Sequence, residues 1–177
     1  MNLEKRKKRF LELIEPLMQN LESFAIAMAG SRDIAKDLVS ETVLTAWQQF
    51  DSLRSEEAFL SYLFTICRRA YYAGKKYKLN EIACSEEEID EMFKIELNVD
   101  DKLDLQYIFV ELGKLDPEIK EAVILHYVNG LQHKEIAEIQ DKSVNAVKMS
   151  IYRAKNTVRK NLRINTDQSI GGEKNEQ

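Results

Sequence analysis

Proline, glycine, cysteine and histidine are scarce in this chain, whose 177 residues include only 2 Pro, 6 Gly, 2 Cys and 2 His. Because 32% of the residues are charged and so few favour turns, the composition argues against a loop-rich β protein and favours helices. The two cysteines stand outside any Cys-x-x-Cys pattern and are too few for a disulfide framework. We therefore expect reduced thiols and no metal site.

Long apolar runs are also missing. No stretch of about 18 apolar residues could span a membrane, and no apolar run of a signal peptide follows the charged first ten residues. We therefore expect a soluble, cytoplasmic protein without membrane insertion.

A catalytic arrangement is missing as well. The only histidines, His126 and His133, have no group of partner carboxylates outside their own segment. No glycine-rich loop that could bind phosphates is present. An enzyme acting on nucleic acid is therefore the least favoured class, and we expect neither catalysis nor a cofactor.

Helical periodicity dominates the first part of the chain. Between Ile34 and Phe50 apolar residues recur every three or four positions, which places them on one buried stripe. After a polar break at 51–57, a second helical segment is rich in aromatic residues and ends with several basic ones. In that segment Phe59, Tyr62, Leu63 and Ile66 repeat at helical spacing and are expected in the core. Residues 1–78 are thus predicted to form one helical domain.

The composition changes sharply after residue 78. Residues 81–104 hold ten carboxylates and two lysines, so this segment repels itself and has little to bury. We predict an acidic linker at 79–104, a second helical domain at 105–165 and a disordered polar tail at 166–177. The predicted fold class is all-α, with two small helical domains that fold separately.

The second domain carries a helix-turn-helix pattern. Asp116 and Pro117 are typical of a helix start, because one caps the helix and the other suits its first position. A short helix at 134–140, a turn at 140–142 and a long helix capped by Ser143 are expected to follow. The apolar residues expected on the core side of the long helix are Val144, Val147, Ile151, Ala154, Val158 and Leu162.

The long helix is strongly basic. Residues 142–163 carry seven positive charges and no acid, although the whole chain has a net charge of -4. In helix-turn-helix proteins the second helix enters the major groove, where early residues contact base edges and others hold phosphates. The residues expected at DNA are Asn145, Lys148, Met149, Tyr152, Arg153, Lys155, Arg159 and Lys160. An ordinary amphipathic helix with a solvated basic face is the alternative.

Two stretches of the chain resemble bacterial RNA polymerase sigma factors. The residues LDPEIKEAVILHYVNGLQHKEIAEI and SVNAVKMSIYRAKNTVRKNL are similar to the fourth conserved region of that family, and SRDIAKDLVSETVLTAWQQFDSLR and FLSYLFTICRRAYY are similar to the second. Their order, the short linker and the lack of a middle domain resemble the extracytoplasmic-function (ECF) subfamily of the sigma-70 family. The resemblance covers about residues 10–163. It implies that residues 1–78 are sigma region 2 and residues 105–165 are sigma region 4.

The resemblance also implies a function. Such a protein binds core RNA polymerase and directs promoter-specific transcription initiation. Asp37, Ser40 and Glu41 match the positions that dock on the clamp helices of the β′ subunit, and their oxygens suit arginine-rich helices. Region 4 would also meet the β flap, and an anti-sigma protein is a further implied partner. For these three residues a plain solvated helix face is the alternative.

Promoter contacts follow from the same resemblance. The segment from Asp51 to Lys78 matches the part that opens the minus-ten element, where aromatic and cationic side chains suit unstacked bases. The candidates there are Arg68, Arg69, Tyr71, Tyr72, Lys75 and Lys76. The basic helix would contact the minus-thirty-five element, with Lys148, Met149, Tyr152 and Arg153 at the matching positions.

The chain departs from the family pattern at the turn. Gln140-Asp141-Lys142 replaces the usual Leu-Gly-Ile, so Asp141 must adopt the left-handed conformation of the glycine. Loss of two apolar residues is expected to loosen this turn, and Ser150 replaces a frequent basic residue. A stand-alone helix-turn-helix regulator remains the alternative function, although the first 78 residues lack the pattern of a sensor domain.

Overall fold

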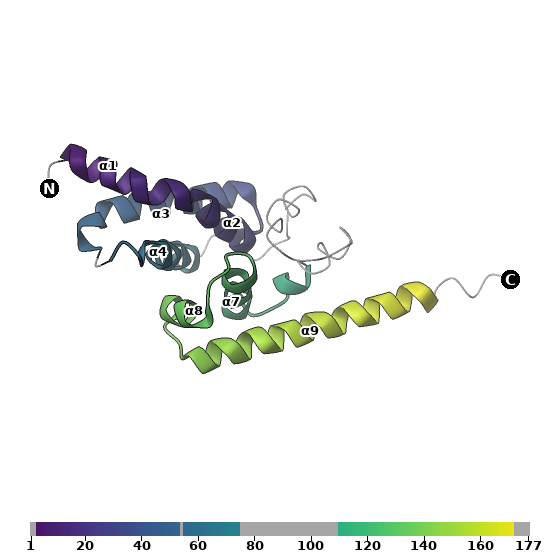
Figure 1. Cartoon of the computed structure of the whole chain (residues 1–177). Coiled ribbons are helices and arrows are strands. Elements are labelled where there is room, and N and C mark those ends of the chain that lie inside the picture. The colour runs from purple at the N-terminus through teal and green to yellow at the C-terminus, as the bar shows by residue number, and fades with distance from the viewer. Residues whose placement is uncertain (1–2, 54, 75–109, 172–177) are drawn as a thin grey trace.

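The computed structural model describes residues 3–53, 55–74 and 110–171, and within these ranges the regular secondary structure is entirely helical. The first group of elements is α1 (Leu3–Ile14), η1 (Glu15–Leu17), α2 (Met18–Ala29), α3 (Arg32–Gln48), η2 (Phe50–Ser52) and α4 (Phe59–Ala73). The second group is α7 (Pro117–Tyr127), α8 (His133–Gln140) and α9 (Val144–Gly171), preceded by a short helical piece at 110–113 (Figure 1). The predicted acidic linker at 79–104 lies outside the described residues.

An aromatic cluster holds α1 on the N-terminal domain. The Phe10 ring lies edge-on to Trp47, Phe50 and Phe59, with centroids 5.3, 5.2 and 6.0 Å away. Such edge-to-face pairs stabilise a core beyond the area they bury. As predicted, Phe59, Leu63 and Ile66 are buried, whereas Tyr62 is half-buried.

The expected capping of the helix-turn-helix is confirmed. The Asp116 carboxylate accepts a hydrogen bond of 3.0 Å from the Glu118 amide, and Pro117 is the first residue of α7. The Ser143 hydroxyl accepts one of 3.2 Å from the Ala146 amide at the start of α9. Each cap satisfies an amide that has no partner inside its own helix.

Two details of the long helix differ from the sequence prediction. A disordered tail was predicted from residue 166, but α9 continues to Gly171. Val144 was predicted on the core side, but 36% of its surface is exposed, and it is the first residue of α9. Val147, Ile151 and Ala154 are buried as expected.

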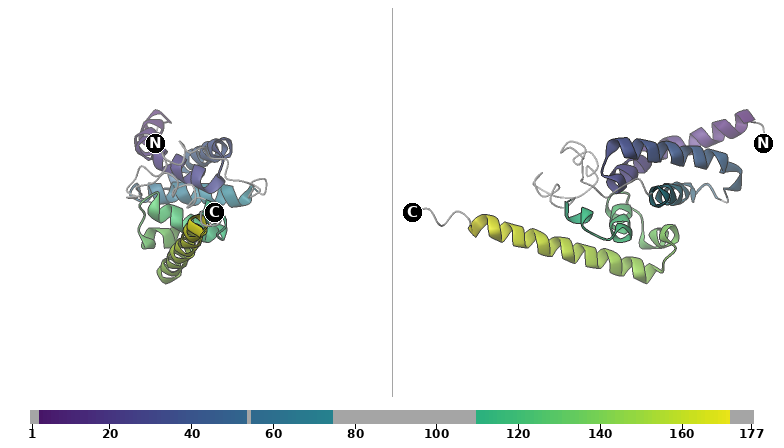
Figure 2. Two further views of the ribbon diagram at one scale, coloured as in Figure 1. Left: turned by 90° about the vertical axis from the view of Figure 1, so that its right-hand side faces the viewer. Right: turned by 180° about the vertical axis from the view of Figure 1, so that it is seen from behind.

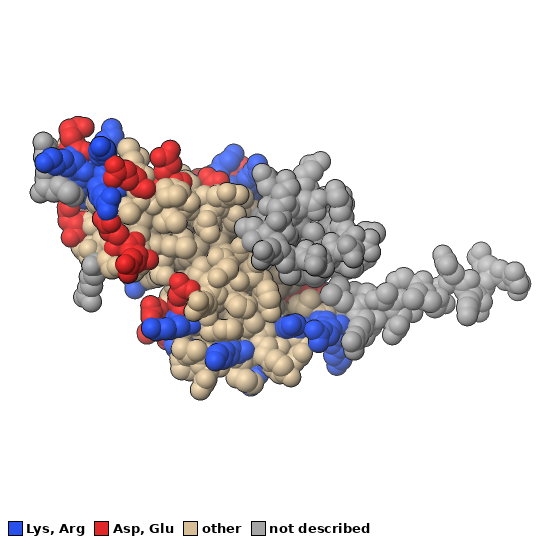
Figure 3. Space-filling model, viewed as in Figure 1, with Lys and Arg blue, Asp and Glu red and all other residues tan. Residues whose placement is uncertain are grey.

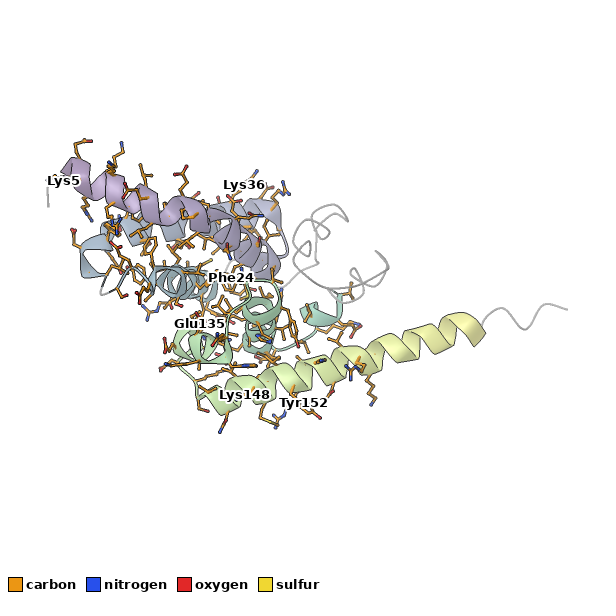
Figure 4. All side chains as sticks on the ribbon, in the orientation of Figure 1. Lys5, Phe24, Lys36, Glu135, Lys148 and Tyr152 are labelled. Carbon is orange, nitrogen blue, oxygen red and sulfur yellow. The ribbon has the colours of Figure 1, made fainter. Side chains whose placement is uncertain are left out.

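Each domain has an apolar cluster of its own, around Phe10 in the first and Val123 in the second, and a third cluster spans both domains. This third cluster joins Phe24 and Leu38 of the first domain to Leu125 and Ile136 of the second. Helix α7 packs on α2, and α8 packs on α4 (Figures 1 and 2). The apolar faces of α2 and α4 are thus covered by the helix-turn-helix, because burying apolar surface is favourable wherever the partner comes from. Phe24 lies at this junction (Figure 4).

Candidate nucleic-acid and polymerase interfaces

The turn between α8 and α9 has the backbone conformation that the sequence predicts. Asp141 has φ 53° and ψ 49°, and among the described residues it alone combines a positive φ with a side chain. Aspartate tolerates this left-handed conformation better than most residues, since its short polar side chain can bond locally. The turn therefore adopts the left-handed conformation without a glycine.

Polar contacts are found at the two turn positions where the family pattern has apolar residues. Gln140 is buried, and its side-chain amide donates a 2.9 Å hydrogen bond to the Glu118 carbonyl. The Lys142 ammonium lies 2.6 Å from the Glu118 carboxylate. Both residues thus tie the turn to the start of α7, which fixes the direction in which α9 leaves.

The solvent face of α9 carries the residues predicted to contact DNA. Asn145, Lys148, Met149, Tyr152, Arg153, Lys155, Arg159 and Lys160 are all exposed. Tyr152 and Met149 are 62% and 47% exposed, although side chains of this size are normally more buried. Lys148 and Tyr152 project away from the rest of the protein (Figure 4), and basic side chains are spaced along this edge of the surface (Figure 3). The helix thus presents cations, amides and an aromatic ring on one accessible face.

The candidates on α4 lie in different surroundings. Arg69 is exposed, whereas the Arg68 side chain is only 19% exposed and contacts α7. Tyr71 is buried and Tyr72 is 37% exposed, so Tyr72 is the more accessible of the two rings. Lys75 and Lys76 lie outside the described residues.

Arg68 and Tyr72 converge on one carboxylate of the second domain. The Arg68 Nε atom lies 2.9 Å from Glu121 Oε1, and the Tyr72 hydroxyl donates a 3.1 Å hydrogen bond to Glu121 Oε2. The Arg68 guanidinium also lies over the Tyr72 ring, 5.1 Å from its centroid. The sequence does not reveal this cluster, because Glu121 lies about fifty residues from Arg68 and Tyr72 and on the other domain.

Burial controls the ionisation of this cluster. Glu121 has no exposed surface, and burial raises the pKa of its carboxyl group while the Arg68 charge and the hydrogen bonds oppose that shift. Burial and the neighbouring Glu121 charge raise the pKa of Tyr72, so its hydroxyl stays protonated and can donate.

The predicted polymerase-docking residues lie on the solvent face of α3. Asp37, Ser40 and Glu41 are exposed, while Leu38 and Thr42 between them are buried. The same face continues one turn further to Leu44, which is 56% exposed. Leu44 was not among the predicted residues, although its spacing of three from Glu41 and four from Ser40 places it on their face.

The described histidines and the described cysteine lie in half-buried or buried surroundings. No group of three or more His, Cys, Asp or Glu side chains in them could hold a metal ion. The centroids of the His126 and His133 rings lie 4.7 Å apart. Cys67 is buried, and desolvation raises the pKa of its thiol to about 12. Of the helices described, none has the length and apolar character needed to cross a membrane.

Family models match both halves of this arrangement. Residues 13–76, which hold the α3 and α4 candidates, match sigma-70 region 2, and residues 105–158, which hold the helix-turn-helix, match sigma-70 region 4. The chain belongs to the sigma-70 family. The sequence resemblance is thereby confirmed.

Relatives of this sigma factor come from several bacteria. It is 26% identical over 152 residues to the ECF RNA polymerase sigma factor EcfG of Rhodopseudomonas palustris, covering 86% of this chain and 84% of that protein. It is also 26% identical over 173 residues to the ECF RNA polymerase sigma-E factor of Haemophilus influenzae, covering 85% and 86%.

Solved structures have the same fold. The sigma factor RpoE of Bartonella quintana, determined in complex with the anti-sigma factor NepR, matches with a TM-score of 0.69 and 26% identity over 89% of this chain and 98% of that one. CnrH, determined with the cytosolic domain of CnrY, matches in fold with a TM-score of 0.68. The chain is thus an alternative sigma factor that directs promoter-specific transcription initiation, and a stand-alone regulator is not favoured.

Proposed function

We propose that three separate surfaces of this sigma factor divide the work of initiation. Helix α9 contacts the minus-thirty-five element, α4 contacts the minus-ten element and α3 docks on the β′ clamp helices. The observation that carries this division is the exposed face of α9, where eight candidate DNA-binding side chains stand outward while Val147, Ile151 and Ala154 are buried.

On α9, position along the helix separates two kinds of contact. Asn145, Lys148 and Met149 lie in its first two turns and meet base edges, since the start of a recognition helix enters the groove. Tyr152 and Arg153 continue that face. Lys155 and Arg159 lie further along and neutralise phosphates, which contributes affinity that depends on salt rather than on sequence.

On α4, cationic and aromatic side chains suit single-stranded DNA. Arg69 and Arg68 would neutralise the backbone, and Tyr72 would stack on an unpaired base, which is worth roughly 1–3 kcal/mol. Lys75 and Lys76 would extend the basic surface beyond the end of the helix.

On α3, a small mixed surface suits a partner helix. Asp37 and Glu41 would pair with arginine side chains, Ser40 would accept or donate a hydrogen bond, and Leu44 would supply an apolar contact. Region 4 would meet the β flap.

Three further assignments follow from this role. The protein works as a dissociable subunit without catalysis of its own. It acts in the cytoplasm, where promoter DNA and polymerase are found. An anti-sigma factor is a further partner, in keeping with the Bartonella quintana sigma factor, which was solved with one.

Run-off transcription tests the proposal. Core polymerase would be assayed on a promoter template with and without this protein, and separately for association by gel filtration. We expect promoter-dependent transcripts and a stable holoenzyme. Duplex binding without any polymerase association would instead support a stand-alone regulator.

A further inference from the structure

Helix α1 contacts both ends of the connection between α3 and α4, which comprises residues 49–58. At the first end, the Arg6 guanidinium donates a 2.7 Å hydrogen bond to the Trp47 carbonyl, in the last turn of α3. The same guanidinium lies 3.2 Å from the Asp51 carboxylate and 4.4 Å from the centroid of the Trp47 ring. A cation is favoured at this end of a helix, because the last carbonyls have no partner inside it. Arg6 therefore fixes where the chain leaves α3.

At the second end, Arg9 pairs with Glu56 through two atoms of each side chain. Arg9 Nε donates a 2.7 Å hydrogen bond to Glu56 Oε1, and Arg9 Nη2 pairs with Glu56 Oε2. The Glu56 carbonyl in turn accepts a 3.0 Å hydrogen bond from the Phe59 amide, at the first residue of α4. The Phe10 ring, beside Arg9, packs against Phe50 in the connection and Phe59 after it. One face of α1 thus holds the connection near each of its ends.

The Arg9–Glu56 pair is too exposed to contribute much to stability. The two side chains are 47% and 48% exposed, and ion pairs in such surroundings contribute little because solvent screens them and ordering them costs entropy. A bidentate pair between guanidinium and carboxylate does fix the orientation of both groups. The pair is therefore better suited to hold the connection in one conformation than to hold the fold together.

The connection is acidic, although it begins the segment that resembles the minus-ten region. Asp51, Glu56 and Glu57 are exposed on it, and a bare carboxylate there would repel a DNA phosphate. Arg6 and Arg9 neutralise the first two of these charges. Figure 3 shows basic and acidic side chains next to one another at the N-terminal end of the molecule.

We propose that Arg6 and Arg9 are positioning residues for promoter opening. They hold the two ends of the α3–α4 connection and neutralise its carboxylates, so that the connection and α4 present one preorganised surface to the unpaired minus-ten strand. A surface that is already ordered loses less entropy when the strand binds. The inference rests on the proposed function, because that assigns the minus-ten element to α4, and it adds α1 to the elements on which opening depends.

The first test exchanges the two charges of the exposed pair in holoenzyme made with the full chain. Arg9→Ala should slow open-complex formation about tenfold or more, since small misplacements of a contacting group are costly. Glu56→Arg alone places two cations opposite each other and should also be slow. Arg9→Glu combined with Glu56→Arg restores the pair in the reverse direction and should recover most of the rate. The rate is followed by the fluorescence of 2-aminopurine in the minus-ten element of the promoter duplex used for run-off transcription.

The matched control is Lys8→Ala, which removes the same charge from an exposed position of α1 and should leave the rate unchanged. Because the pair is exposed, Arg9→Ala should lower the midpoint of thermal unfolding by less than about 4 °C. Its holoenzyme assembly and its binding to a minus-thirty-five duplex should match those of the parent.

Hydrogen exchange in the free chain measures the positioning without polymerase. In the connection, the Ser52 and Leu53 amides donate hydrogen bonds to backbone carbonyls, and such amides exchange only when the segment opens locally. Arg9→Ala should therefore speed exchange within residues 49–58 and leave α8 unchanged. Arg6→Lys should act in the same way, because lysine keeps the charge but lacks the planar guanidinium.

The inference is overturned if Arg9→Ala opens the promoter at the parent's rate, if Lys8→Ala loses as much, or if Glu56→Arg alone opens it quickly. It is equally overturned if the charge exchange recovers nothing, or if Arg9→Ala leaves exchange in the connection unchanged. Failure of the parent holoenzyme to open the promoter at all would instead refute the proposed function.

Discussion

Arg68 and Glu121 form an ion pair at 2.9 Å although they are 53 residues apart, and the carboxylate has no exposed surface. Removing one partner of a buried pair leaves the other charge uncompensated and costs about 3 kcal/mol or more. Because Arg68 and Glu121 belong to different domains, removal of either partner is expected to weaken the contact between them.

Truncation of Arg68 should destabilise the protein strongly. We expect Arg68→Ala to lower the free energy of unfolding by about 3 kcal/mol, because Glu121 keeps its burial and loses its counterion. Chemical denaturation monitored by circular dichroism measures this. Arg69→Ala, on the exposed neighbour, should cost less than about 0.5 kcal/mol, and equal losses for both variants would contradict a special role of the pair.

Acid should destabilise the protein through Glu111. Hydrogen bonds from Lys114 and Asn161 lower the pKa of this carboxyl group. Since the folded pKa lies below the unfolded one, the stability it contributes is complete above the ordinary value of about 4.5 and is lost as pH falls through the folded pKa. Glu111→Gln should flatten the stability profile in that window, measured by denaturation at several pH values. Glu138→Gln, at an exposed carboxylate on α8, is the matched control.

Replacing Asp141 should affect stability in opposite directions depending on the new residue. Asp141→Gly removes the Cβ that is strained at a φ of 53°, so it should raise the free energy of unfolding by less than about 1 kcal/mol. Asp141→Ala keeps a Cβ at this positive φ in a residue that tolerates the left-handed conformation less well than aspartate, so we expect destabilisation by about 1 kcal/mol. Thermal unfolding of both variants measures this, and a stabilising alanine would contradict the conformational explanation.

Truncation of Arg153 should weaken promoter recognition without affecting the enzyme partner. We expect Arg153→Ala to cost about 1–3 kcal/mol in binding to a minus-thirty-five duplex if it contacts a base edge. Anisotropy at several salt concentrations measures the loss and, by its slope, separates base from phosphate contacts. Lys134→Ala on α8 is the matched control, and holoenzyme assembly should be normal in both variants.

Charge reversal on α3 should weaken polymerase binding and leave promoter recognition intact. Asp37→Lys with Glu41→Lys places like charges opposite the arginine-rich helices expected in the partner, so we expect at least about tenfold weaker association with core polymerase. A pull-down measures this, with duplex binding by α9 unchanged. Glu15→Lys with Glu22→Lys makes the same change in net charge at other exposed positions. Undisturbed association of the first variant would remove α3 from the interface.

Much of the fold and of the candidate site could be predicted from local patterns. The caps by Asp116 and Ser143, the left-handed Asp141 and the exposed face of α9 depend on interactions within a few residues, and each is confirmed. Val144 was misplaced because hydrophobicity predicts burial only where a partner helix lies opposite.

The remaining features depend on contacts between residues that are far apart in the sequence. In the sequence, Gln140 and Lys142 appear only as polar replacements of apolar turn residues. The structure adds that both contact Glu118 at the start of α7. Leu44 lies on the solvent face of α3 that carries the proposed docking residues, but in the sequence it cannot be told from the buried apolar residues of that helix.

The sequence by itself therefore determined the helices, their caps, the two family regions and the basic face of α9, because each depends on short-range periodicity and charge. Only the tertiary structure decided that one apolar cluster spans both domains and that Arg68 and Tyr72 bond to Glu121. The physical reason is that burial of a charge and the pairing of distant side chains depend on how whole helices pack, which no local pattern encodes.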